Sequence, residues 1–134
     1  MNKRLMISFL VTCLLAAAPA LGDSKEMVVE IYRVAPGKHE EFLRQIALFD
    51  QVNVEAGVAP RQLFVHKNGA SWDFLILQPA HYTDEENKKL NAAWDKRGLP
   101  GGAKFFVTFR QLIAEHTDTN VEATTAAEYL KKLE

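Results

Sequence analysis

Cysteine is almost absent from this sequence. Its 134 residues include one cysteine, Cys13, which lies within an amino-terminal apolar run. If that run is removed as a signal peptide, the remaining chain has no disulfide, no thiol nucleophile and no thiolate metal ligand. A long hydrophobic run is lacking as well, because the stretch from Leu5 to Ala17 is shorter than the roughly 20 residues that span a bilayer.

The beginning of the chain has the order of a secretory signal peptide. Lys3 and Arg4 precede the apolar run, and small residues then alternate up to position 22. Two cleavage sites fit this pattern, one after Ala20 and one after Gly22. We therefore expect export to the periplasm or the medium, with residues 1–22 as the signal peptide and residues 23–134 as one domain.

An excess of positive charge is also lacking. The sequence has 16 Lys and Arg against 17 Asp and Glu, a net charge of −1, and the loss of two basic residues with the signal peptide makes it −3. Nucleic-acid binding is not expected, because it would show clustered basic residues. No contact with a membrane is expected after the signal peptide is removed.

The residues that follow predict a strand, a helix and a hairpin. β-Branched and aromatic residues predict a strand at Met27–Val34, and helical apolar spacing predicts a helix from Lys38 to about Gly57. Two further strands are predicted at Gln62–Lys67 and Trp72–Gln78. Asn68-Gly69-Ala70-Ser71 joins them, and Asn-Gly supplies the positive φ values that a tight hairpin turn demands.

The last of these strands is apolar on both faces. Phe74 and Ile76 point to one side, and Leu75 and Leu77 point to the other. A sheet with one face in water would alternate apolar with polar residues. Something is therefore expected to cover each face of the sheet.

The second half of the chain predicts further helices. Thr83-Asp84-Glu85-Glu86 is a capping box that begins one helix. Residues 103–115 are ambiguous, because their apolar spacing favours a helix while Phe-Phe-Val-Thr-Phe has the composition of a strand; we predict a helix. A short strand at Thr117–Ala123 and a helix at Thr125–Leu133 complete the prediction.

The resulting order is that of an α+β, ferredoxin-like fold, a split β-α-β around an antiparallel hairpin with an extra carboxyl-terminal helix. With its P-G-K-x-x-E-F-like segment at Ala35–Phe42, the hairpin at Leu63–Leu77 and the late segment His116–Thr119, the sequence resembles the dimeric α/β-barrel superfamily. That superfamily includes small monooxygenases of the antibiotic-biosynthesis type and haem-degrading enzymes. The resemblance implies a homodimer, in which a second subunit covers the sheet face that the helices leave open. It implies a scaffold and no particular chemistry.

The candidate catalytic residues are His116, Asp118 and His66. Residues two apart in a strand share a face, and a histidine beside a carboxylate can act as a general base, which favours His116 with Asp118. His66 alternates with Phe64 and is expected between the sheet and its partner. The structural alternatives are a half-buried strand histidine for His66 and a local turn for the other two. The four histidines show no metal-binding spacing, so no metal site is predicted.

The candidate ligand-binding residues are mostly aromatic and are expected to line one cleft: Trp72, Phe74, His81, Tyr82 and Trp94. Core packing also explains such rings in a small domain. Arg33, Arg61 and Arg110 are candidate anchors for an anionic ligand.

Four functions follow from these residues. The leading one is an exported protein that holds a small apolar or aromatic ligand between sheet and helices. A second is a cofactor-independent monooxygenase or isomerase with a histidine base, which needs no cofactor. A third is haem binding, with His66, His81 or His116 as the axial ligand. The fourth is a non-catalytic interaction protein.

Overall fold

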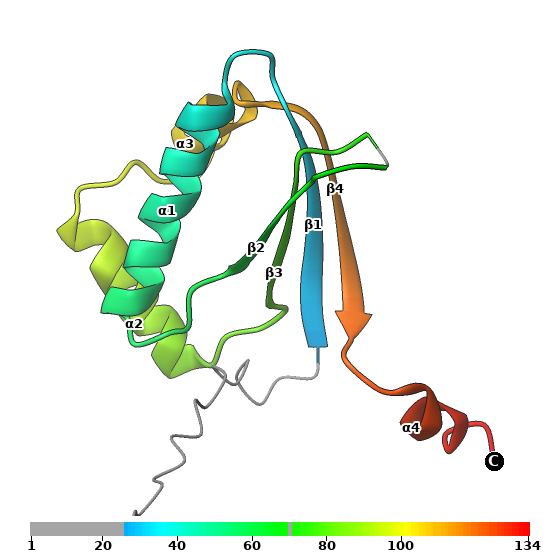
Figure 1. Cartoon of the computed structure of the whole chain (residues 1–134). Helices are drawn as coiled ribbons and strands as arrows, with labels where there is room; N and C mark the ends of the chain where they lie inside the picture. Colours follow the sequence, from blue (N-terminus) through cyan, green and yellow to red (C-terminus); the bar gives the residue numbers. More distant parts are fainter. Residues whose placement is uncertain (1–25, 70) are drawn as a thin grey trace, which may run out of the picture.

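The computed structural model describes residues 26–69 and 71–134 (Figure 1). The predicted signal peptide and both of its cleavage sites lie outside these residues. Among the helices that the structure describes, none has the length and apolar character needed to cross a membrane.

The elements follow one another in the predicted order. They are β1 (Glu26–Val34), α1 (His39–Glu55), β2 (Gln62–Val65), β3 (Phe74–Pro79), α2 (Asp84–Lys96), α3 (Gly102–Arg110), β4 (Ile113–Glu122) and α4 (Ala126–Leu130). The first three strands and the first two helices begin and end within a few residues of the predicted positions.

The four strands form one antiparallel sheet in the order β2-β3-β1-β4. This order, with two β-α units around a central hairpin, is the ferredoxin-like arrangement. Figure 1 shows α1, α2 and α3 on one side of the sheet, while α4 lies beyond the end of β4. The predicted α+β ferredoxin-like fold is confirmed.

The core lies between the sheet and α1. Phe42 of α1 is fully buried, and its ring lies 4.9 Å from that of Tyr32, 5.5 Å from that of Phe74 and 5.9 Å from that of Phe109. Aromatic pairs at such distances are favourable beyond the apolar area that they bury. One helix residue therefore joins β1, β3 and α3 in a single packed cluster.

The hairpin between β2 and β3 forms as predicted, but its turn differs from the prediction. The His66 amide donates to the Asp73 carbonyl at 3.0 Å, and eight residues, 66–73, separate the two strands. Gly69 has a φ of 104°, whereas no described residue other than glycine has a positive φ. A tight turn of the type I′ class needs two successive positive φ values. The expectation of such a turn at Asn68-Gly69 was wrong.

The boundary between α3 and β4 is the largest correction. The helix predicted for residues 103–115 ends at Arg110, and the strand predicted at Thr117–Ala123 begins four residues earlier, at Ile113. The Leu112 carbonyl accepts from the Ala35 amide at 2.9 Å, and Glu115 pairs with Arg33 of β1. Leu112 is buried in this arrangement, and pairing of the following residues with β1 prevailed over the helical spacing.

The capping box of α2 forms as predicted. The Glu86 amide donates to Thr83 Oγ1 at 3.2 Å, and the Thr83 amide donates to Glu86 Oε2 at 2.8 Å. The Thr83 amide and hydroxyl, which both donate to the Glu86 carboxylate, hold the pKa of that carboxyl below its ordinary value. The carboxyl-terminal helix has a similar box at Thr125, but it is shorter than predicted and ends at Leu130.

We expect Phe42→Ala to lower the free energy of unfolding by about 3–5 kcal/mol, because it empties a fully enclosed site in the core. Phe106→Ala is the matched control, since Phe106 is 63% exposed and its loss should change stability by about 0.5 kcal/mol at most. Urea denaturation followed by circular dichroism measures both. Equal losses in the two variants would contradict this account of the core.

Candidate functional site

A cavity of about 610 Å³ lies between the sheet and α1, α2 and α3. Its volume is in the range of sites for small molecules. Its apolar wall is formed by Ile46, Phe49, Val52, Leu90, Trp94, Phe105, Phe106, Phe109 and Ile113. Its polar side is formed by Glu30, Tyr32, Asn53, Arg61, Tyr82, Asn91, Arg110, His116 and Asp118.

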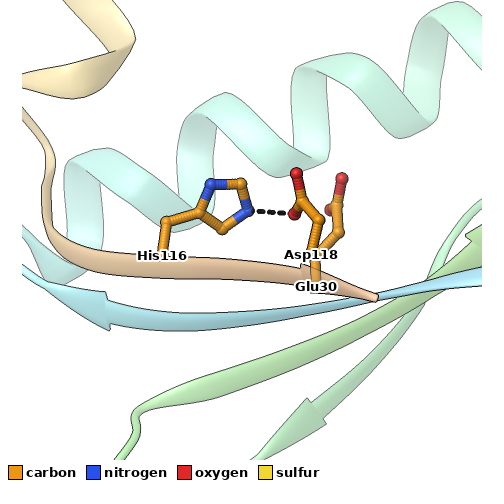
Figure 2. A group of neighbouring side chains, drawn as sticks. All are labelled: Glu30, His116 and Asp118. Carbon is orange, nitrogen blue, oxygen red and sulfur yellow. Dashed lines mark ion pairs between the residues drawn. The ribbon is translucent and has the colours of Figure 1, made fainter. Parts of the chain in front are cut away.

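The floor of the cavity is a group of three residues on two paired strands, Glu30, His116 and Asp118. Alternation along β4 puts His116 and Asp118 on the same face, and Glu30 of β1 is the register partner of Asp118. Figure 2 shows the three side chains pointing to the same side of the sheet. We call this group the floor triad.

His116 is held between a ring and a carboxylate. Its imidazole stacks on Tyr32, with ring centroids 4.3 Å apart and planes 10° apart. Its Nε2 lies 2.6 Å from Asp118 Oδ1, which is an ion pair when the imidazole is protonated. Nε2 is buried, and the contact does not have hydrogen-bond geometry. The imidazole ring is therefore held in place, while Nε2 remains able to form a hydrogen bond or to coordinate a metal ion.

Glu30 is a desolvated carboxylate with defined partners. Burial raises the pKa of its carboxyl group, and Arg61 and a hydrogen bond from Tyr32 oppose that rise. Gln78 Nε2 donates to Glu30 Oε1 at 2.7 Å, and the Tyr32 hydroxyl donates to Oε2 at 3.2 Å. Burial and the neighbouring Glu30 likewise raise the pKa of Tyr32 above its ordinary value. These bonds fix the carboxylate at the floor.

Arg61 extends this polar network along the cavity. Its Nε donates to Gln78 Oε1 at 2.8 Å, so Gln78 links the Arg61 guanidinium to the Glu30 carboxylate. The guanidinium carbon lies 5.0 Å from the centre of the Phe49 ring, within reach of a cation–π interaction. The network thus joins the polar floor to the aromatic wall.

The aromatic wall is a set of contacting rings from α1, α2 and α3. The rings of Phe49 and Trp94 are 5.7 Å apart, those of Trp94 and Phe105 are 5.4 Å apart, and those of Phe105 and Phe109 are 5.7 Å apart. Tyr82 lies at the polar side, and burial raises the pKa of its hydroxyl. A flat apolar molecule would match such a wall.

The structure places the predicted site residues in two sets. His116, Asp118, Tyr82 and Trp94 all line the cavity. The others lie outside it: His66 and Trp72 contact each other at the hairpin end with ring centroids 4.9 Å apart, His81 lies 3.5 Å from Glu26, and Phe74 is packed in the core. The expectation that the five ligand-binding candidates line one cleft does not hold for Trp72, Phe74 and His81.

Sequence reasoning missed Glu30, Tyr32 and Asn53 and gave Arg61 only as one of three arginine anchors. Glu30 did leave a signal, because it is an acidic residue flanked on both sides by apolar and aromatic residues of a strand. Its partner across the sheet depends on the β1–β4 register, which spacing along one segment does not contain.

The floor triad is also the group of described residues that could hold a metal ion. One ligand atom from each of its three members lies within 4.8 Å of the others. A nitrogen and two carboxylate oxygens next to an open cavity can either exchange protons with a ligand or coordinate a cation.

Comparison with known proteins gives fold likenesses alone. No protein-family model matches the sequence, and no curated protein matches it. A solved structure from Agrobacterium tumefaciens is 11% identical, covers 75% of this chain and 95% of its own, and has a TM-score of 0.48. One from Pseudomonas aeruginosa is 15% identical over 75% and 93%, with a TM-score of 0.45. A structure described as a dimeric ferredoxin-like protein, from an uncultured marine organism, is 10% identical over 75% and 87%, with a TM-score of 0.43. Likenesses of this level assign neither a family nor an activity.

We expect Gln78→Met to lower the free energy of unfolding by about 1–3 kcal/mol, because Glu30 and Arg61 both lose a hydrogen-bond partner inside the cavity. Gln51→Met is the control: Gln51 accepts one bond from Arg97 at the surface, and its loss should cost about 0.5 kcal/mol or less. Chemical denaturation of both variants measures the difference. If Gln78→Met is as mild as Gln51→Met, the network does not stabilise the site.

Proposed function

We propose that this protein is an exported homodimer that binds a small, flat aromatic ligand carrying a polar group, in the cavity between sheet and helices. The observation that carries the proposal is the cavity itself, with contacting aromatic rings on one side and the floor triad on the other. Export rests on the sequence of residues 1–22, and amino-terminal sequencing of the mature protein tests it.

Two features of the cavity support this class of ligand. The ring wall supplies the apolar, planar contact that fits an aromatic body. Glu30, held by Gln78 and Tyr32, and His116, held by Tyr32, are preorganised to bind a hydroxyl group. The ligand's ring is therefore expected at α2 and α3, and its polar end at β1 and β4.

One catalytic alternative is favoured by a specific contact. His116 lies against Asp118 in the cavity, the arrangement that a histidine base needs to take a proton from an activated aromatic substrate. Oxygen consumption with quinol substrates that falls in His116→Ala, without loss of folding, would support a cofactor-independent oxygenase.

A Soret band on mixing with haem would support the haem alternative instead, for which His116 is the candidate axial ligand inside the cavity.

The two tryptophans provide the test of ligand binding. Trp94 lines the cavity and Trp72 lies outside it. We expect 1-naphthol to quench tryptophan fluorescence saturably in the wild type and in Trp72→Phe. Trp94→Phe should lose the quenching, because the remaining tryptophan is remote from the ligand.

Naphthalene is the matched control ligand, because it has the ring and no polar group. We expect it to bind about tenfold more weakly, the value of about one net hydrogen bond. If no aromatic compound binds, or if quenching follows Trp72, the cavity is not the binding site. Such a result would favour the alternative that this is a non-catalytic interaction protein.

The homodimer rests on the sheet face opposite the cavity. Val29 and Ile31 of β1 pair with Leu77 and Leu75 of β3 on that face, and α1–α3 lie on the other side (Figure 1). Phe64 of β2, the register partner of Leu75, is 47% exposed. A contiguous apolar face of this kind is typical of an interface, and a second copy would cover it with an identical face.

We expect light scattering at micromolar concentration to give the mass of a dimer, and Ile31→Lys to give a folded monomer, because the charge would be buried at the interface. Val54→Lys is the control, since Val54 is 62% exposed on α1, in the helical layer, and the dimer should persist. A monomeric wild type would overturn the homodimer.

A further inference from the structure

We propose that the floor triad, Glu30, His116 and Asp118, binds one divalent transition-metal ion, with Zn²⁺ as the probe. The ligand atoms would be His116 Nε2 and one carboxylate oxygen from each acidic residue. Sequence spacing predicted no metal site, because the third ligand comes from β1, far from the other two in the chain.

The distances between the ligand atoms of the floor triad are close to those of an occupied metal site. Zn²⁺ takes nitrogen and oxygen ligands at about 2.0–2.2 Å, so neighbouring ligand atoms in a tetrahedral site lie about 3.4 Å apart. The three atoms here lie within 4.8 Å of one another, while Nε2 and Asp118 Oδ1 are only 2.6 Å apart. Side-chain rotations that move these atoms by about 1 Å would separate His116 Nε2 from Asp118 Oδ1 and bring the Glu30 carboxylate closer. The three ligand atoms would then have tetrahedral spacing.

His116 provides the second, independent observation. Its Nε2 is buried and has no hydrogen-bond partner, although it points at the two carboxylates. A buried polar atom without a hydrogen-bond partner is uncommon and indicates a bound neighbour, such as a water or an ion. The imidazole nitrogen and the desolvated Glu30 carboxylate would both gain from a cation at this point.

The surroundings hold the ligands as metal ligands are usually held. Tyr32 stacks on the His116 ring and donates to Glu30 Oε2, and Gln78 donates to Glu30 Oε1. Partners of this kind orient metal ligands and commonly change metal affinity by 10–100-fold when they are lost. The sheet therefore supplies both the ligands and their supports.

The donor set favours one class of ion. One imidazole nitrogen with two carboxylates suits Zn²⁺, Fe²⁺ or Mn²⁺, whereas Ca²⁺ takes six or more oxygen ligands. Three protein ligands leave coordination positions open, and the cavity lies beside them. If the proposed function holds, the open positions would take an oxygen of the aromatic ligand; the metal site itself does not depend on that ligand.

The test is calorimetric titration of the tag-free, chelator-treated protein with Zn²⁺. We expect one ion per chain and an affinity at least about tenfold lower in His116→Ala, Glu30→Gln and Asp118→Asn. The two carboxylate-to-amide variants keep the side-chain shape, so they decide the matter if His116→Ala does not fold. Thermal unfolding in the presence of Zn²⁺ gives a second readout. We expect Zn²⁺ to raise the unfolding temperature of the wild type and not that of the three variants.

His39→Ala is the matched control. His39 Nε2 lies 3.4 Å from Asp73 Oδ1, a histidine–carboxylate pair without a third ligand in the described part of the chain, and its removal should leave the affinity unchanged. The proposal is overturned if the wild type binds no Zn²⁺ at micromolar concentration, or if His39→Ala weakens binding as much as Glu30→Gln. Naphthol quenching of Trp94 in the metal-free protein is measured separately, so either proposal can fail while the other stands.

Discussion

The antiparallel pairing of β1 with β4 is the constraint on which the site depends. Its register sets Tyr32 opposite His116 and Glu30 opposite Asp118, and alternation turns all four side chains toward the helices. A shift of one residue would send the β4 members to the other face. The stacked ring, the buried carboxylate and the ion-pair contact thus all follow from one set of backbone hydrogen bonds.

The two faces of the sheet have different roles because the helices lie on one of them. On that face, Phe42 packs against Tyr32 in the core, and the aromatic rings of α2 and α3 line the cavity. On the other face, Val29 and Leu77 form an apolar surface that no described helix covers. The proposed ligand and the proposed second subunit would therefore contact opposite faces of one four-stranded sheet.

Local chemistry predicted much of the fold. The Thr83–Glu86 capping box and the β2–β3 hairpin were recognisable because their signals lie within a few residues. The α3–β4 boundary was not, because residues 103–115 fit a helix by their apolar spacing and a strand by their composition. Pairing with β1, a partner about eighty residues earlier in the chain, decided it. The prediction of a tight turn at Asn68-Gly69 was wrong for a different reason. The connection between β2 and β3 is longer than a two-residue turn, so it does not need two successive positive φ values.

Local sequence patterns were enough to predict the ferredoxin-like order of elements and to put His116 and Asp118 on one face, because alternation along a strand is a local property. It also singled out Tyr82 and Trp94 as ligand-binding candidates. Packing in three dimensions brought Glu30 to His116 and Asp118 and left His66, His81 and Trp72 outside the cavity. The physical reason is that periodicity gives the face of each side chain, whereas strand register and helix packing give its neighbours.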